Sequence, residues 1–226
     1  ANLQSRIATR VLLQLAKAPY RNEQNVYDAA FEVAWQRWFS VERSIRVDVT
    51  AIRSPLKSLE FITLRIKDAV CDRFRAERGQ RPNVDTRSPE VRIAAFLDAH
   101  NVTVYLDTSG EPLYKRGYRS ERGEAPLKEN LAAGVLALAC WDAEEPLFDP
   151  MCGSGTFVIE AAMMALRIPP GAGRGFGFER LLAHDPVLWR AVRDAGTGAQ
   201  EKLRALPVFG ADVAGRRLAR RARQAA

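Results

Sequence analysis

The feature that most constrains the fold is the string FDPMCGSGT at residues 148–156. It begins as a short apolar strand that ends in Asp149, and it then turns through two glycines into an apolar stretch typical of a helix. Gly153 and Gly155 allow the backbone to approach a ligand closely and to expose amide N–H groups at the start of that helix. Such a strand–turn–helix unit is typical of a parallel sheet with helices on its faces.

The rest of the second half repeats this alternation. We expect strands at 147–149, where the strand is buried, and at 208–210, and a turn-rich surface excursion at 169–180. The expected helices cover residues 126–141, 154–166, 189–206 and 215–226. A doubly wound sheet normally has five or more strands, so we expect further strands of it to lie outside these 226 residues.

The first half has a different pattern, which indicates a small α+β domain. Clean alternation predicts a half-buried strand at 44–52, and further strands are predicted at 6–15, 91–97 and 102–106, the last two as a hairpin. Helices are expected at 25–39 and 59–78, the second ending at Gly79. The apolar stripe predicted for this second helix consists of Phe61, Leu64, Ala69, Val70 and Phe74. The fold class is therefore α/β, with an α+β domain at 1–120, the start of a Rossmann-like domain at 121–226, and a boundary near Ser120.

Composition excludes several classes of protein. With 47% hydrophobic and 27% charged residues, an ordinary core is expected. The longest apolar run, 131–141, is about half of what a membrane span needs, and no charged-then-apolar leader opens the chain, so we expect a cytoplasmic protein without a membrane partner. Three cysteines without CxxC spacing and two histidines argue against a disulfide framework and against a metal site.

The net charge of +7 is unevenly distributed. Residues 1–120 carry 20 Lys and Arg against 14 Asp and Glu, whereas residues 121–215 carry 9 against 13. This excess of positive charge in residues 1–120 indicates that they bind a polyanion, with a solvated basic surface as the alternative.

Taken alone, the glycine turn admits two readings. It can be a tight βα turn without a ligand, or a site where amides meet a bound group. A phosphate-binding P-loop is disfavoured because GKS and GKT are absent, and the third glycine of GxGxxG is replaced by Val158.

Four strings taken together are more specific than the glycines. DPMCGSGT at 149–156, followed by IEAA at 159–162, resembles the cofactor motif of the S-adenosylmethionine (SAM)-dependent RNA methyltransferases that carry a THUMP domain. YKRGYR at 114–119 is similar to the link between the two domains of that family, APLKENLAA at 125–133 to a segment lining the cofactor, and RPNVD at 81–85 to a THUMP loop. Within the family, the chain looks most like the bacterial enzymes that methylate N2 of a guanine in large-subunit ribosomal RNA.

This resemblance implies roles for particular residues. The cofactor SAM would be bound by Asp149, Pro150, Cys152, Gly153, Ser154, Gly155, Thr156, Asp212 and Lys128. Asp149 would lie near its ammonium group and Asp212 would accept hydrogen bonds from its ribose hydroxyls. Spacing alone rejects Asp212, because it follows Gly155 by far more than the ~20 residues of a compact dinucleotide fold.

Large-subunit ribosomal RNA would be the partner of the first domain. The residues implied to contact it are Lys67, Arg75, Arg81, Asn83, Arg87, Lys115, Arg116 and Arg119. For each, a solvated helix face is the alternative. The family's catalytic Asn/Asp-Pro-Pro-Tyr string does not occur in residues 1–226, so the catalytic residues are expected beyond Ala226.

The remaining cysteines and tryptophans are interpreted as packing groups. Cys152 is read as a small filler rather than a nucleophile, and Cys71 and Cys140 as core residues. Trp35 and Trp38 are expected to pack, with base stacking as the alternative.

Two classes of function remain open. The first is an enzyme that transfers a methyl group from SAM to guanine N2 of ribosomal RNA, or to adenine N6, since a similar loop serves both amines. The second is a non-catalytic RNA-binding module.

Overall fold

The computed structural model describes residues 1–118 and 127–213, which divide into two compact units. We call Arg10–Glu111 with Phe176–Pro186 the four-stranded unit, and Ala1–Thr9, Pro112–Gly175 and Val187–Ala226 the glycine-loop unit. The predicted boundary near Ser120 and the predicted helix at 215–226 lie outside the described residues.

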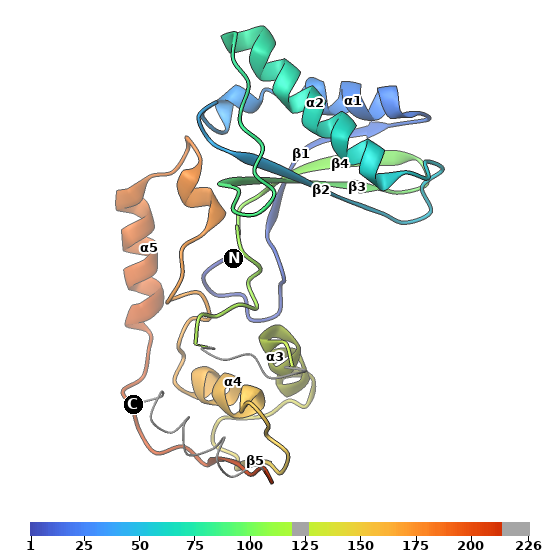
Figure 1. The fold of residues 1–226 in the computed structure, drawn as a ribbon. Helices are drawn as coiled ribbons and strands as arrows, with labels where there is room; N and C mark the ends of the chain where they lie inside the picture. The colour runs from blue at the N-terminus through green and yellow to red at the C-terminus, as the bar shows by residue number, and fades with distance from the viewer. Residues whose placement is uncertain (119–126, 214–226) are drawn as a thin grey trace. The chain divides into compact units, whose positions relative to one another are not determined.

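The four-stranded unit is a mixed sheet with two helices on one side (Figure 1). Its strands are β1 (Leu12–Pro19), β2 (Ile45–Ala51), β3 (Val91–Leu97) and β4 (Asn101–Asp107), in the order β1-β4-β3-β2. β4 pairs antiparallel with β1 and β3, which confirms the predicted hairpin, and β2 pairs parallel with β3. The helices are α1 (Glu23–Phe31) and α2 (Leu59–Arg78).

Helix α2 has the predicted bounds because both of its ends are capped. The Ser58 hydroxyl accepts a hydrogen bond from the amide of Phe61, and Gly79 ends the helix in a left-handed conformation with φ 69°. The predicted apolar stripe is wrong at Phe61 and Leu64, which are 49% and 48% exposed. The helix instead buries a stripe that starts at Ile62, and Phe61 and Leu64 lie outside it at 3.6 residues per turn.

The chain before β2 departs from two predictions. The strand predicted at 6–15 lies at 12–19, where pairing with β4 determines its register. The helix predicted to reach Phe39 ends at Phe31, and a 3₁₀ helix, η1 (Trp35–Arg37), follows. There the indole N–H of buried Trp35 donates to the carbonyl of Ala30 at 2.8 Å, the acceptor that a continuing helix would offer to the amide of Ala34. Trp35 and Trp38 both pack in or against the core, as predicted.

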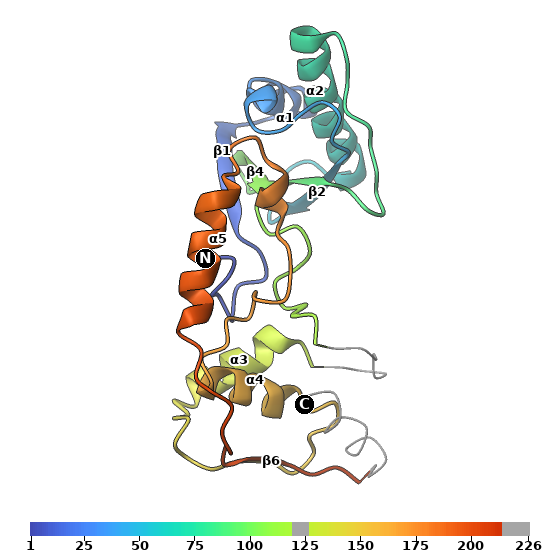
Figure 2. The same cartoon turned by 90° about the vertical axis from the view of Figure 1, so that its left-hand side faces the viewer.

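The glycine-loop unit contains a parallel two-stranded sheet with helices on one side (Figures 1 and 2). Its strands are β5 (Leu147–Asp149) and β6 (Val208–Gly210), and the helices beside them are α3 (Glu129–Leu138) and α4 (Thr156–Ala165). Parallel pairing of β5 with β6 confirms that the second half begins a parallel sheet.

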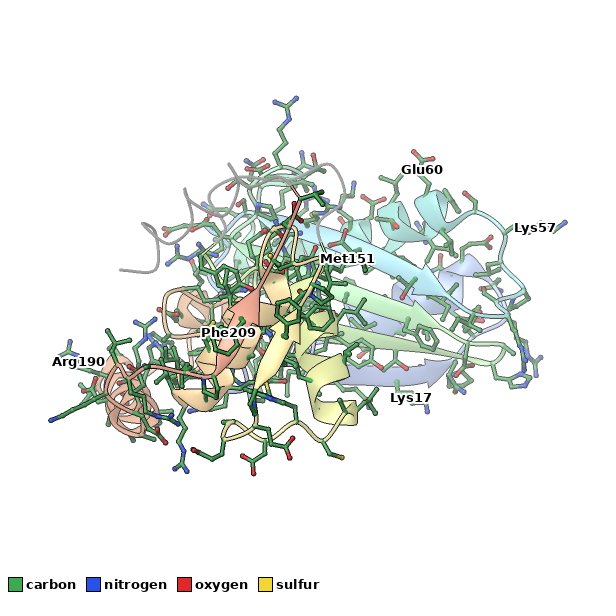
Figure 3. The ribbon with its side chains drawn as sticks, turned by 90° about the horizontal axis from the view of Figure 1, so that it is seen from below. Lys17, Lys57, Glu60, Met151, Arg190 and Phe209 are labelled. Atoms are coloured by element: carbon green, nitrogen blue, oxygen red, sulfur yellow. The ribbon has the colours of Figure 1, made fainter. Side chains whose placement is uncertain are left out.

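The other face of this small sheet is exposed among the described residues. Phe148 and Phe209 are neighbours across the two strands and are 64% and 56% exposed (Figure 3 labels Phe209). The prediction of a buried strand at 147–149 is therefore wrong in the described structure, because α4 packs against one face of the sheet and α3 packs against α4.

Other differences concern the connections. α3 is shorter than predicted, and α5 (Pro186–Gly198) begins and ends earlier than the predicted 189–206. Pro169, Gly171 and Phe176 are buried, so residues 169–180 are not the predicted surface excursion; Gly177–Arg180 form a 3₁₀ helix, η2. Cys71 is buried as expected, but Cys140 is exposed just beyond α3 with φ 52°, which corrects its assignment to the core.

Candidate functional site

The candidate site is the loop that leads from β5 into α4. Two of its residues, Gly153 (φ 47°) and Gly155 (φ 72°), adopt left-handed backbone conformations in which side chains are disfavoured. Gly155 occupies the N-cap of α4, and its amide donates to the carbonyl of Cys152 at 2.6 Å. The first turn of α4 thus presents backbone N–H groups at the positive end of the helix dipole.

Strand β6 brings a second acid to this loop. The carbonyl of Asp149 accepts from the amide of Ala211, and the carbonyl of Ala211 accepts from the amide of Cys152, both at 2.9 Å. This extension of the pairing places the Asp212 carboxylate 2.9 Å from the amide of Gly153, from which it accepts a hydrogen bond. The long separation in sequence that disfavoured Asp212 is thus bridged by the parallel pairing.

Close packing keeps the two strand ends together. A Cβ atom on Gly210 would lie 3.0 Å from the Cβ of Cys152, 3.0 Å from the Cγ2 of Val158 and 3.1 Å from the Cys152 Sγ. Cys152 is buried against this glycine, the position expected of a filler side chain.

The other loop residues lie at the same place. The Asp149 carboxylate accepts from the amide of Met151 at 3.1 Å, and the hydroxyls of Ser154 and Thr156 lie 3.1 Å apart. Pro150 is exposed and Thr156 is buried. The structure therefore brings together eight of the nine predicted cofactor residues.

Lys128, the ninth predicted cofactor residue, lies outside this loop and contacts Tyr114. It occupies the N-cap of α3, where its Nζ lies 5.4 Å from the centre of the Tyr114 ring. This cation–π contact orients the ammonium group within the glycine-loop unit.

Five predicted RNA-binding residues belong to the four-stranded unit. Lys67 and Arg75 lie on α2, each paired with a neighbouring aspartate, Asp68 and Asp72, at 2.6 Å. Arg81, Asn83 and Arg87 are exposed on the loop after α2. Arg75 is exposed and Lys67 is half-buried, and ion pairs in contact with solvent contribute little to stability, so a polyanion can compete for these charges.

Hydrogen bonds to β2 and to the Asp85 carboxylate hold the loop that carries Arg81, Asn83 and Arg87. The amide of Ile45 donates to the carbonyl of Asn83 at 2.8 Å, and the Asp85 carboxylate accepts from the amides of Ser88 and Arg87 at 3.0 and 2.8 Å. These two bonds lower the pKa of Asp85. The RPNVD string is thus a turn fastened to the start of β2.

The prediction that Arg116 contacts RNA is corrected by the structure. Arg116 is 4% exposed, and its Nε donates to the Glu160 carboxylate at 3.3 Å. A guanidinium enclosed in this way cannot reach an RNA phosphate. Lys115 is exposed, and Arg119 lies outside the described residues.

Sequence reasoning missed the partner of Arg116. Glu160 is the one acid of α4, whose other residues are apolar apart from Thr156. An isolated charge on such a helix is a signal of buried pairing, because an unpaired buried carboxylate is costly.

No helix within residues 1–118 and 127–213 is long and apolar enough to cross a membrane. In the same part of the chain, no group of three or more His, Cys, Asp or Glu side chains gathers as metal ligands would.

A parallel strand–loop–helix with an acid after each strand is the start of a Rossmann-like, cofactor-binding domain, and here it accompanies a separate α+β sheet unit. Comparison with known families agrees with both parts. Residues 20–107 match the THUMP domain, and residues 116–226 match the family described as UPF0020, RMKL-like, methyltransferase domain. The chain therefore carries a THUMP domain followed by a methyltransferase domain of the UPF0020 family, and the predicted fold class is confirmed.

The relatives that match this chain are named as methyltransferases. Proteins named "Ribosomal RNA large subunit methyltransferase K/L" are 44% identical over 84% of this chain in Psychromonas ingrahamii and 38% identical over 94% of it in Colwellia psychrerythraea. The chain spans only 26% and 30% of the length of these two relatives.

Two solved structures share the fold. SMU.472, assigned as a methyltransferase and solved in complex with SAH, is 30% identical with a TM-score of 0.86; the match covers 99% of this chain and 60% of that one. A protein from Listeria monocytogenes, described as a predicted N6-adenine-specific DNA methylase, is 26% identical with a TM-score of 0.88, over 99% of this chain and 59% of its own.

Proposed function

We propose that the chain is part of an enzyme that transfers a methyl group from SAM to the exocyclic N2 of a guanine in large-subunit ribosomal RNA. The observation that carries the proposal is the loop between β5 and α4, where the Asp149 carboxylate accepts from the amide of Met151 and the Asp212 carboxylate accepts from the amide of Gly153. The THUMP match, the methyltransferase-domain match and the names of the relatives support it. Work on a ribosomal substrate would place the protein in the cytoplasm.

The residues of the loop fit the chemistry of SAM. SAM has an α-amino-acid end and two ribose hydroxyls, and when bound it would supply an electrophilic methyl group on a sulfonium. Asp149 would pair with the ammonium group of SAM. The amides at the start of α4 would hold the carboxylate group of SAM, because a negative charge is favoured at the positive end of a helix.

Asp212 would fix the ribose. A carboxylate accepts about four hydrogen bonds, so it can hold the amide of Gly153 and two hydroxyls at once. The glycines leave room for the cofactor to lie against the backbone.

The four-stranded unit would bind the RNA. Residues 1–120 hold most of the net positive charge, and Arg81 and Arg87 are exposed on a loop that hydrogen bonds hold in place. The enzyme would then hold the target amine in line with the methyl group, after the base leaves its stack.

Adenine N6 is the second candidate target, favoured by the description of the Listeria protein. The THUMP match favours RNA over DNA as the nucleic acid. A non-catalytic RNA-binding module is the remaining alternative, since the Asn/Asp-Pro-Pro-Tyr string is absent from residues 1–226.

The test is methylation of protein-free large-subunit ribosomal RNA by the full-length protein with isotopically labelled SAM, followed by nucleoside analysis. We expect labelled N2-methylguanosine, strongly reduced in Asp212→Asn and retained in Asp142→Asn, an exposed acid of the same unit. Labelled N6-methyladenosine would support the second target. No transfer to any RNA, with RNA binding retained, would support the non-catalytic module.

A further inference from the structure

Four side chains of the glycine-loop unit form a buried polar cluster, which we call the Glu160 cluster: Arg6, Arg116, Tyr118 and Glu160. The Glu160 carboxylate accepts from Arg116 Nε at 3.3 Å and from the Tyr118 hydroxyl at 3.2 Å, both through Oε1. The side chains of Arg116 and Glu160 are 1% and 0% exposed. An ion pair so deeply enclosed requires close geometry, because each charge has lost its water.

The cluster fastens three segments that are distant in sequence. Arg116 also donates to the carbonyl of Leu113 at 2.6 Å and to the carbonyl of Arg6. Arg6 in turn donates to the carbonyls of Met163 at 3.0 Å and Ile168 at 2.7 Å, at the far end of α4. Residues 1–9, residues 112–118 and α4 thus meet around one carboxylate.

The position of Glu160 on α4 connects this cluster to the cofactor loop. α4 begins at Thr156, directly after the glycines, and Glu160 lies one turn further along. A helix transmits displacement along its length, because each turn is hydrogen bonded to the next. Whatever holds Glu160 therefore also holds the amides at the start of α4.

We propose that Glu160 and Arg116 are positioning residues for cofactor binding, which hold α4 so that the loop at 150–155 keeps the geometry that SAM requires. The proposal rests on the proposed function, because it concerns the same loop. Neither side chain needs to touch the cofactor.

The Glu160 cluster depends on the negative charge of the Glu160 carboxylate. Burial raises the pKa of Glu160, while the charge and hydrogen bond of Arg116 oppose this shift. Glu160 Oε2 and Arg6 Nη1 are buried and make no hydrogen bond among the described residues, so the hydrogen bonds to the carboxylate there all go to Oε1. Removing the negative charge would leave Arg116 buried without a counter-ion.

The experiment compares Glu160→Gln with Glu144→Gln in the full-length protein. Glu144 is the matched control, since it belongs to the same unit and pairs with Arg204 at 3.2 Å but is well exposed. The unfolding midpoint of every variant is measured first. The Kd for SAM, by calorimetry, and the Kd for large-subunit ribosomal RNA are then measured well below that midpoint. We expect Glu160→Gln to weaken SAM binding about tenfold, which corresponds to about 1.4 kcal/mol, with RNA binding unchanged. Glu144→Gln should change neither Kd.

A folded Glu160→Gln protein with the parent's Kd for SAM would overturn the proposal, and a lowered midpoint would then assign the cluster to stability alone. If Glu160→Gln does not fold, Tyr118→Phe removes one hydrogen bond to the same carboxylate and keeps the ring; a severalfold weaker Kd for SAM supports the proposal and an unchanged Kd overturns it. If the parent protein itself does not bind SAM, both the proposed function and the role of the cluster are wrong. If the parent binds SAM and Glu160→Gln binds it equally well, only the role of the cluster is wrong.

Discussion

Alanine at position 210 should disturb the cofactor loop and the stability of its unit together. Gly210 ends β6, and its added methyl group would lie 3.0–3.1 Å from Cys152 in the loop and Val158 in α4. Ordinary contacts of this kind are a few tenths of an ångström longer, and the methyl group meets two elements at once. The Cβ of Cys152 is fixed to the backbone of the loop, so it can retreat only if the loop moves.

The magnitude follows from two opposing effects. Inserting a methylene-sized group into a packed site costs about 1–3 kcal/mol. Replacing glycine by alanine recovers about 0.5–1 kcal/mol of backbone entropy. We therefore expect Gly210→Ala to lower the free energy of unfolding by about 1 kcal/mol, the difference between the midpoints of these two ranges.

Gly134→Ala is the matched control. Gly134 lies within α3 with an ordinary φ, and nothing lies within 4 Å of its added methyl group. Alanine there should raise the free energy of unfolding by up to about 1 kcal/mol, because it favours the helix.

Urea unfolding of the two variants and the parent, with a SAM titration of each, tests the pair. We expect opposite signs for the two stability changes and weaker SAM binding only in Gly210→Ala. Equal stability of Gly210→Ala and the parent, or changes of the same sign in both variants, would refute the packing argument.

Three further predictions concern the four-stranded unit. Phe74→Ala should lower the free energy of unfolding by about 3–5 kcal/mol because Phe74 is buried, whereas Phe61→Ala should cost well under half as much; equal costs in urea unfolding would restore the stripe predicted from sequence. Gly177→Ala should lower the thermal midpoint, because its methyl group would lie 2.8 Å from the backbone nitrogen of Gly110 and 3.0 Å from the carbonyl oxygen of Asp107; an unchanged midpoint would contradict this close approach. Two amides of the β3–β4 turn lower the pKa of Asp98, so its ionised form stabilises the fold above about pH 4 and this contribution is lost as the pH falls through the lowered pKa. The stability difference between the parent and Asp98→Ala should therefore shrink below about pH 4, and a difference independent of pH would contradict it.

Local signals predicted the elements that depend on nearby residues. The bounds of α2 and β3 agree with the structure because caps and alternation act over a few residues. The Gly153–Gly155 turn was also predictable, since its left-handed conformations require glycine.

Features that depend on tertiary packing were not predictable. Arg116 looks like a surface cation in a basic string, and only its contact with Glu160, 44 residues away, makes it a buried group. Likewise, the pairing of β5 with β6 decides whether Asp212, 59 residues from Gly153, reaches the loop. Each is a contact between residues that the local pattern does not connect.

The most direct test of the account is a calorimetric titration of the full-length protein with SAM, comparing the parent with Asp212→Asn and Asp142→Asn. We expect the parent to bind SAM at the glycine loop, at least about tenfold more weakly in Asp212→Asn and with unchanged affinity in Asp142→Asn. SAM binding that is equally strong in all three proteins would contradict the assignment of the glycine loop and Asp212 as the cofactor site.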